Sequence, residues 1–247
     1  MFRLFCLLVG VAVPCAALAP ALCLAQDGGA QKETAQDDTN SATMSMSEKV
    51  DKLLGDKQAQ KAIDLMAKVY DDQMIDVLHR QRGAALRMLG QTENARKQYD
   101  AAVAKGPDNA SSYLARGYFI AEHSTTDALP DFQKGVELDD SNADADGDLG
   151  ALLAMLSRYK DAEPHLRRAL ELDPNNPGYL TNLAEALRNT DRAEEALGVT
   201  KRALKIDNQF RRAYFVQGLV LQSLDQDSQA AKSYTIAIKI SPSHSFA

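Results

Sequence analysis

Cysteine is almost missing from this chain, and tryptophan does not occur. The three cysteines, Cys6, Cys15 and Cys23, all lie within the first 25 residues. The remaining residues can therefore form neither a disulfide framework nor a cysteine-based zinc site. A chain of 247 residues with 45% hydrophobic and 25% charged composition can nevertheless bury a core. We expect a fold that depends on hydrophobic packing.

The chain also lacks an excess of positive charge. Its 28 lysines and arginines are outnumbered by 34 aspartates and glutamates, which gives a formal net charge of -6. Proteins that bind nucleic acids usually present a basic face to the phosphate backbone. The composition therefore argues against nucleic acid as a partner.

Catalytic motifs are absent from the sequence as well. It contains no metalloprotease helix motif, no glycine-rich phosphate loop with its lysine and no nucleophile elbow. The four histidines form no local cluster, since they stand at His79, His123, His165 and His244. We therefore expect a protein that is not an enzyme and that needs no cofactor.

One stretch has the alternating oxygen ligands of a calcium-binding loop. Residues 142–148 read NADADGD, with Gly147 as the turn glycine. The bidentate acid that would complete such a loop is missing, because Leu153 stands at the twelfth position. The same acids open a predicted helix, where exposed amides and the helix dipole favour negative charge. We interpret them as a helix start and expect no metal site.

The first 25 residues have the pattern of a secretory signal. Arg3 precedes an uncharged apolar run over residues 4–25, which ends in the small residues Cys23 and Ala25. We expect cleavage after Ala25 and a periplasmic or secreted protein. Two alternatives stay open: the run of 22 residues could remain as a membrane anchor, or a lipid could modify a cysteine.

Composition then divides the rest of the chain. Residues 26–47 have almost no large apolar side chain and are predicted to be a disordered linker. Helical periodicity begins in residues 48–75, is interrupted at Gly55 and Asp56, and then resumes. We expect this segment to form an N-terminal helical cap or a degenerate repeat.

Small residues recur at intervals of 33 or 34 residues through the last two thirds of the chain. Such a period is the mark of a solenoid protein. It divides residues 76–244 into five units, 76–109, 110–142, 143–176, 177–210 and 211–244, each with the pattern of two helices. Three series of residues keep this phase: Gly83, Gly117, Gly150, Ala184 and Gly218; Ala95, Ala128, Ala162, Ala196 and Ala230; and Ala102, Gly135, Ala169, Ala203 and Ala237.

The third unit shows why the spacing matters. Gly150 and Ala162 are 12 residues apart and meet where two antiparallel helices cross, so that their backbones can approach closely. Together with Leu153, Leu166, Ala169 and Pro174, they resemble the tetratricopeptide repeat. The resemblance implies an all-α solenoid of about five stacked helix pairs, preceded by the degenerate pair. Asp146 and Thr200 depart from it, because large apolar residues are usual at their positions.

In that family, the first helices of the pairs line a concave groove that holds a peptide or a helix of a partner protein. The resemblance therefore implies an interaction scaffold or adaptor, and the signal-like N-terminus leads us to expect it in the cell envelope. The alternatives are a membrane-anchored receptor, which requires an uncleaved N-terminal segment, or an accessory subunit of an envelope enzyme complex. The expected partner-binding residues, which suit a segment with apolar and acidic side chains, are Arg80, Arg87, Leu114, Tyr118, Met155, Glu185, Arg188, Arg212, Phe215 and Leu219.

A solvated concave face, with binding elsewhere, is the competing interpretation. The last helix is the second candidate surface, because only residues 241–247 follow it and we expect no polar helix there to cover Tyr234, Ile236, Ile238 and Ile240. A partner or a second copy could dock there. Alternatively, these side chains pack within the last unit.

Overall fold

The computed structural model describes residues 37–69 and 74–240 of the chain. The predicted signal peptide, its cleavage site and the first part of the predicted linker lie outside these residues. The described residues form helices and no strand, which confirms the all-α class. The helices are α2 (Asp37–Gly55), α3 (Ala59–Met66), α4 (Asp76–Met88), α5 (Thr92–Lys105), α6 (Ala110–Ala121), α7 (Thr125–Leu138), α8 (Ala143–Met155), α9 (Tyr159–Leu172), α10 (Pro177–Arg188), α11 (Ala193–Ile206), α12 (Arg211–Ser223) and α13 (Asp227–Ile240).

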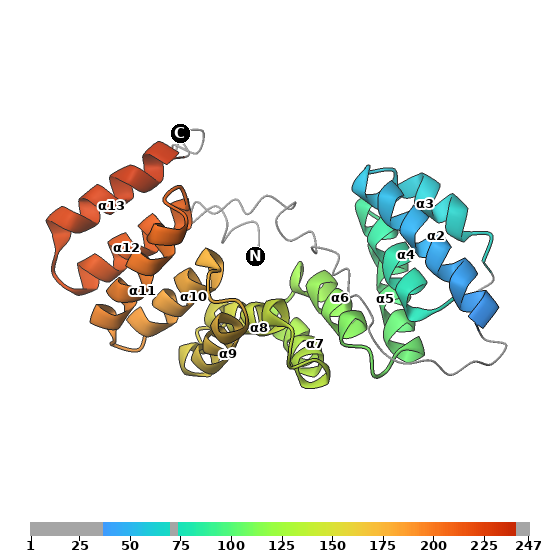
Figure 1. The fold of residues 1–247 in the computed structure, drawn as a ribbon, viewed down its shortest axis with the longest axis horizontal. Coiled ribbons are helices and arrows are strands. Elements are labelled where there is room, and N and C mark those ends of the chain that lie inside the picture. The colour runs from blue at the N-terminus through green and yellow to red at the C-terminus, as the bar shows by residue number, and fades with distance from the viewer. Residues whose placement is uncertain (1–36, 70–73, 241–247) are drawn as a thin grey trace. The chain divides into compact units, whose positions relative to one another are not determined.

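Each of the five predicted units contains two of these helices, with α4 and α5 in the first and α12 and α13 in the last. The described residues, whose helices are labelled in Figure 1, form two bodies, and the boundary between them falls near the end of α6. We call the described residues through Phe119 the N-terminal body and those from Ile120 onward the C-terminal body. In the C-terminal body, α8 packs on α9, α10 on α11 and α12 on α13. Successive pairs meet through α9 with α10 and through α11 with α12, and α10 also contacts both α8 and α12.

The N-terminal body follows the same plan over fewer helices. Helix α4 packs against α5, and both α2 and α3 pack against α4. Val50, Ala62, Met66 and Ala85 are buried together at the centre of this body. Helix α2 begins at Asp37, within the segment where the sequence predicts a disordered linker. The helix thus starts earlier than composition suggests.

The repeated small residues lie where helices of a pair cross. Ala95, Ala128, Ala162 and Ala196 have no exposed surface. A Cβ atom placed on Gly150 would lie 2.6 Å from Cγ of Leu166 and 3.3 Å from the carbonyl oxygen of Ala162. The predicted close approach of the helices is therefore present, and a larger side chain would push them apart.

The turns inside the pairs repeat as well. Lys57, Gly90, Ser157, Asp191 and Asp225 all have positive φ, between 56° and 73°, just after a first helix. This left-handed conformation ends a helix and reverses the chain. Lys57 stands 33 residues before Gly90, so the pair α2 and α3 turns in phase with the repeats. None of the described helices is long and apolar enough to cross a membrane.

Candidate functional site

The candidate site lies on the first helices of the pairs. In the C-terminal body, α8, α10 and α12 contact one another in order, and we call them the first-helix row. The predicted partner-binding residues are divided between the two bodies. Met155, Glu185, Arg188, Arg212, Phe215 and Leu219 belong to the first-helix row, whereas Arg80, Arg87, Leu114 and Tyr118 belong to α4 and α6 of the N-terminal body.

An ion pair joins two neighbouring helices of the row. Nη2 of Arg212 on α12 lies 3.0 Å from Oε2 of Glu185 on α10, and about a third of each side chain is exposed. The sequence analysis expected both residues in the groove, and the structure brings them together across adjacent repeats. A ligand carboxylate at this place would compete with Glu185 for the Arg212 guanidinium.

Arg188 lies one turn further along α10 and is half-buried. Its Nη2 donates a hydrogen bond to Oδ1 of Asn189 at 3.2 Å. Its Nε is buried and has no hydrogen-bond partner. The guanidinium therefore has one buried donor that no described residue satisfies.

Apolar side chains flank these charges on the row. The ring of Phe215 on α12 is half-buried and lies 5.7 Å from the ring of Tyr234 on α13. The Tyr234 hydroxyl donates to Oε1 of Gln222 at 2.6 Å. Leu219 is half-buried, and Met155 at the end of α8 is 41% exposed. These side chains offer apolar contact area next to the polar centre of the row.

The start of α8 is covered by the next repeat. A Cβ atom on Gly147 would lie 2.3 Å from Cε1 of Tyr179, so the aromatic ring rests on the glycine backbone. The Tyr179 hydroxyl donates a short hydrogen bond to Asp144. Burial and this bond to the Asp144 carboxylate raise the pKa of Tyr179, so the hydroxyl stays protonated at neutral pH. Tyr179 thus fixes the contact between α8 and α10.

Asp144 and Asp146, which the sequence places in a calcium-like loop, have separate partners. Asp144 accepts from Tyr179, whereas Oδ1 of Asp146 lies 2.8 Å from Nδ1 of His165. Among the described residues, no group of three or more acidic, histidine or cysteine side chains could hold a metal ion.

The N-terminal body carries a polar cluster at the start of its first helices α4 and α6. Nη2 of Arg80 lies 3.9 Å from Oδ2 of Asp76, and that carboxylate also accepts from Asn109 and Ser112 at 2.7 and 3.2 Å. Burial lowers the pKa of Arg80, and the charges of Asp76 and Asp51 partly oppose that shift. The guanidinium is thus stabilised by two acids of the chain itself, Asp76 on α4 and Asp51 on α2.

The other predicted residues of this body differ in exposure. Leu114 on α6 is 8% exposed, so little of its side chain is open to a ligand. Arg87 and Tyr118 are half-buried.

Two carboxamides that the sequence analysis did not select are buried on these first helices, and Gln81 donates from Nε2 to Ser47 Oγ and Asp51 Oδ1 of α2. Gln81 on α4 and Asn182 on α10 are 5% and 8% exposed, and the carbonyl oxygen of each is buried without a hydrogen-bond partner. Each stands two residues before the small residue that marks its repeat, Gly83 and Ala184. They therefore hold the same position in two repeats. This shared position could have been read from the sequence.

These two oxygens belong to a larger set. Among the described residues, the buried side-chain atoms without a partner are Nε of Arg80, Oε1 of Gln81, Oδ1 of Asn182 and Nε of Arg188. All four lie on the first helices α4 and α10, two on each. Each helix offers one donor and one acceptor, which is the complement of a peptide group.

Comparison with protein families identifies the repeat. Three family models described as tetratricopeptide repeat match residues 76–119, 118–177 and 153–217, which together run from residue 76 to 217. Comparison with curated proteins gives no match.

Solved structures with the same fold include MamA and YrrB. A crystal structure of MamA is 22% identical, with a TM-score of 0.60 over 68% of this chain and 92% of that one. MamA 41-end from Desulfovibrio magneticus RS-1 is 19% identical, with a TM-score of 0.62 over 68% and 96%. YrrB, described as a TPR protein with an unusual peptide-binding site, is 24% identical, with a TM-score of 0.58 over 75% and 93%. Identities this low show a shared fold.

Proposed function

Because this chain belongs to the tetratricopeptide-repeat family, we propose that it is a non-enzymatic scaffold that binds a peptide segment or helix of a partner protein. The proposed contact surface is the face of the first helices. The observation that carries this proposal is the pair of buried carboxamides, Gln81 and Asn182, whose carbonyl oxygens have no partner among the described residues. The peptide-binding site for which YrrB is described lies on the same fold.

An unpaired buried oxygen is unfavourable for a protein that functions alone. Leaving such a group unsatisfied costs about 1–3 kcal/mol of stability. A bound peptide removes this cost, because its backbone N–H groups can donate to Asn182 while its carbonyl oxygens accept from Arg188. The arrangement thus suits a ligand that brings its own backbone donors and acceptors.

The side chains around Asn182 indicate what else the ligand carries. Phe215, Leu219 and Met155 provide apolar contacts on the same row of helices. Arg212 is already paired with Glu185. An acidic ligand group therefore gains less binding energy from Arg212 than it would from an unpaired arginine. We infer a segment with apolar anchors, in which acidic groups are recognised chiefly near Arg188.

We further propose that the protein works in the cell envelope, as a periplasmic or secreted adaptor. The support is the sequence of residues 1–25, with its apolar run and small residues before Gln26. A membrane-anchored receptor and an accessory subunit of an envelope enzyme complex are the alternatives. Intact mass of the protein recovered from its native compartment distinguishes the cleaved adaptor from the membrane-anchored receptor, because cleavage leaves Gln26 as the first residue.

Peptide selection tests the binding function directly. A displayed library of random twelve-residue peptides is selected on the purified chain, and the strongest peptide is titrated by calorimetry against the chain and against Asn182→Leu. We expect Asn182→Leu to lose at least tenfold in affinity, because a peptide donor loses its acceptor. The same variant should be as stable as the parent or more so, since an unpaired buried oxygen is removed.

Gln133→Leu is the matched control, because Gln133 is an exposed amide on the second helix α7. It should bind like the parent. Failure to select any peptide, or equal affinity of the chain and Asn182→Leu, would contradict binding at this face.

A further inference from the structure

Arg188 at the end of α10 is half-buried, and none of the described residues forms an ion pair with it. Its Nη2 donates to the neutral side chain of Asn189 at 3.2 Å, and its buried Nε has no hydrogen-bond partner. Nη1 also lacks a partner among the described residues and, unlike Nε, is not buried. A partly desolvated guanidinium with a free donor at the surface gains a charge-assisted hydrogen bond when an anion reaches it.

The charges next to Arg188 leave a positive excess. Glu185 lies three residues earlier on α10, and its carboxylate is 3.0 Å from Nη2 of Arg212. Glu185 and Arg212 therefore neutralise each other, whereas Arg188 has no such counter-ion. The three side chains together carry one positive charge in excess, which favours an acidic ligand group at Arg188.

Side chains of the last helix pair lie beside this guanidinium. Burial raises the pKa of Tyr234, and the positive charge of Arg188 opposes that shift, so Arg188 lies within electrostatic reach of the Tyr234 hydroxyl. The hydroxyl donates to Oε1 of Gln222 at 2.6 Å, which leaves the Nε2 group of the exposed Gln222 as a donor. The Tyr234 ring also packs on Phe215. Helices α10, α12 and α13 thus bring together a guanidinium, an amide donor and an aromatic wall.

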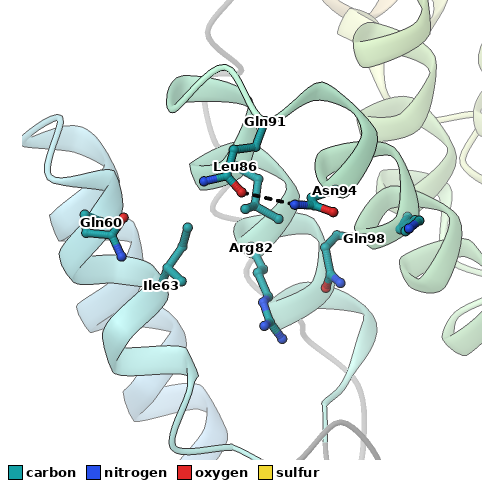
Figure 2. A pocket seen from close by; sticks show the side chains of 8 residues that line it. Gln60, Ile63, Arg82, Leu86, Gln91, Asn94 and Gln98 are labelled. Carbon is teal, nitrogen blue, oxygen red and sulfur yellow. Dashed lines mark hydrogen bonds between the residues drawn. The ribbon is translucent and has the colours of Figure 1, made fainter.

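The arginine of a pocket in the N-terminal body differs in this respect. Figure 2 shows Arg82 of α4 in a pocket of about 370 Å³, with Gln60 and Ile63 of α3 on its opposite side. Nη1 of Arg82 already lies 3.6 Å from Sδ of Met74, and the side chain has a further interaction within the chain. A guanidinium without an acidic partner is therefore not a property of every arginine on a first helix.

The distance between Arg188 and Asn182 sets the length of the ligand segment. The two residues are six positions apart, which is about 9 Å along the axis of α10 and about 240° of rotation. At the outer radius of a helix, about 5–6 Å, their side chains then lie about 13 Å apart. An extended chain covers that length with about four residues.

We propose that Arg188, with the Gln222 amide as a second donor, forms a carboxylate subsite of the peptide-binding face. This inference rests on the proposed function, because it places one acidic group of the bound segment about four residues from the backbone N–H that donates to Asn182. The apolar residues of the segment then pack on Phe215 and Leu219. The carboxylate belongs to an acidic side chain or to a free C-terminus, since both present two oxygens to a guanidinium.

Three peptides test the subsite: acetyl-Leu-Ala-Leu-Ala-Glu-Ala-amide, the same peptide with Gln in place of Glu, and acetyl-Leu-Ala-Leu-Ala-Gln with a free C-terminus. NMR of the isotope-labelled chain follows the Asn182 side-chain amide and the Arg188 Nε–H, whose burial slows its exchange with water. We expect all three peptides to shift the Asn182 signal in a saturable way. At least one of the two carboxylate peptides should also shift the Arg188 signal and bind about tenfold more tightly than the neutral one, which identifies the source of the carboxylate.

Arg188→Gln should bind the acidic and neutral peptides equally. Lys201→Gln, which removes the same charge from an exposed position of the second helix α11, should keep the preference of the parent. The comparison of peptides on the parent chain stays decisive even where Arg188→Gln folds poorly.

Two results separate the subsite from the binding face as a whole. An Asn182 shift without an Arg188 shift, or equal affinity of the parent for all three peptides, would overturn the subsite and leave the proposed function standing. Absence of both shifts with every peptide would contradict the peptide-binding face itself, and the subsite with it.

Discussion

Asp146 on α8 is buried with 4% of its side chain exposed, and its Oδ1 lies 2.8 Å from Nδ1 of His165 on α9. Asp146 departs from the tetratricopeptide repeat pattern, in which a large apolar residue is usual at this position. The structure explains how a carboxylate is tolerated there: the ring nitrogen of His165, from the partner helix of the same pair, satisfies it. The histidine thus compensates for the unusual aspartate.

This pairing predicts the effect of removing the histidine. His165→Ala should lower the free energy of unfolding by about 1–3 kcal/mol, because it leaves a buried carboxylate without its partner. Adding Asp146→Leu to that variant should restore most of the loss, since both polar groups are then replaced by apolar ones. Urea denaturation followed by circular dichroism measures both. Equal stability of His165→Ala and the parent would show that the bond contributes little.

Two glycines in helices should respond to alanine in opposite ways. A Cβ atom on Gly150 would overlap Leu166, whereas one on Gly198 of α11 would have no neighbour within 4 Å. Gly198→Ala should stabilise the protein by about 0.5–1 kcal/mol through helix propensity alone. Gly150→Ala gains the same propensity but overpacks the helix crossing, so it should destabilise by about 1–2 kcal/mol. Thermal unfolding of the two variants compares them, and a stabilising Gly150→Ala would refute the close helix contact.

Four charged residues form a closed ring between α9 and α11. Arg192 contacts both carboxylate oxygens of Glu163 at 2.8 Å and donates to Glu195 at 2.9 Å, while Arg167 lies 2.8 Å from Glu163 and 2.7 Å from Glu195. Burial alone would raise the pKa of Glu163, but the hydrogen bonds from Arg167 and Arg192 outweigh it and lower that pKa. The bond from Arg167 chiefly lowers the pKa of Glu195.

The lowered pKa values of Glu163 and Glu195 set the direction in which the stability of the fold depends on pH. Unfolding takes up protons between the lowered folded pKa and the ordinary value of about 4.3. The ring therefore stabilises the fold above that ordinary value and loses its effect as pH falls through the folded pKa. Glu163→Gln should melt at a lower temperature than the parent at pH 7 and low salt, and the difference should shrink at about pH 3 and in 1 M salt. Glu194→Gln, on α11 outside the ring, is the control; a difference independent of pH and salt would contradict an electrostatic origin.

The last described helix, α13, is the candidate surface for self-association. Ile236 and Ile238 on α13 are 39% and 63% exposed. If a second copy docks on this helix, the parent should exceed the monomer mass in light scattering and Ile236→Lys should not. Because the side chain is exposed, the substitution should change the free energy of unfolding by no more than about 0.5 kcal/mol. Equal masses of parent and variant would exclude this surface for self-association.

How far the site could be predicted depends on what each residue contacts. The mapping from the repeat pattern selected Glu185 and Arg212, and the structure joins them in an ion pair. It also selected Leu114, which the structure buries. Gln81 and Asn182 were missed, because an amide on a predicted helix face gives no sign by itself of whether its oxygen will find a partner.

The sequence by itself determined the solenoid. Its small residues at intervals of 33 and 34 specify each helix crossing locally, and a repeat needs contact only with its neighbours. Only the tertiary structure decided which polar groups are satisfied: Asp146 has His165, whereas Asn182 has no partner for its oxygen. It also decided that α3, α4 and α5 leave a pocket lined by amides and two cations. Helix periodicity follows from the order of residues along one segment, but hydrogen bonding and cavities depend on side chains that other helices bring into reach.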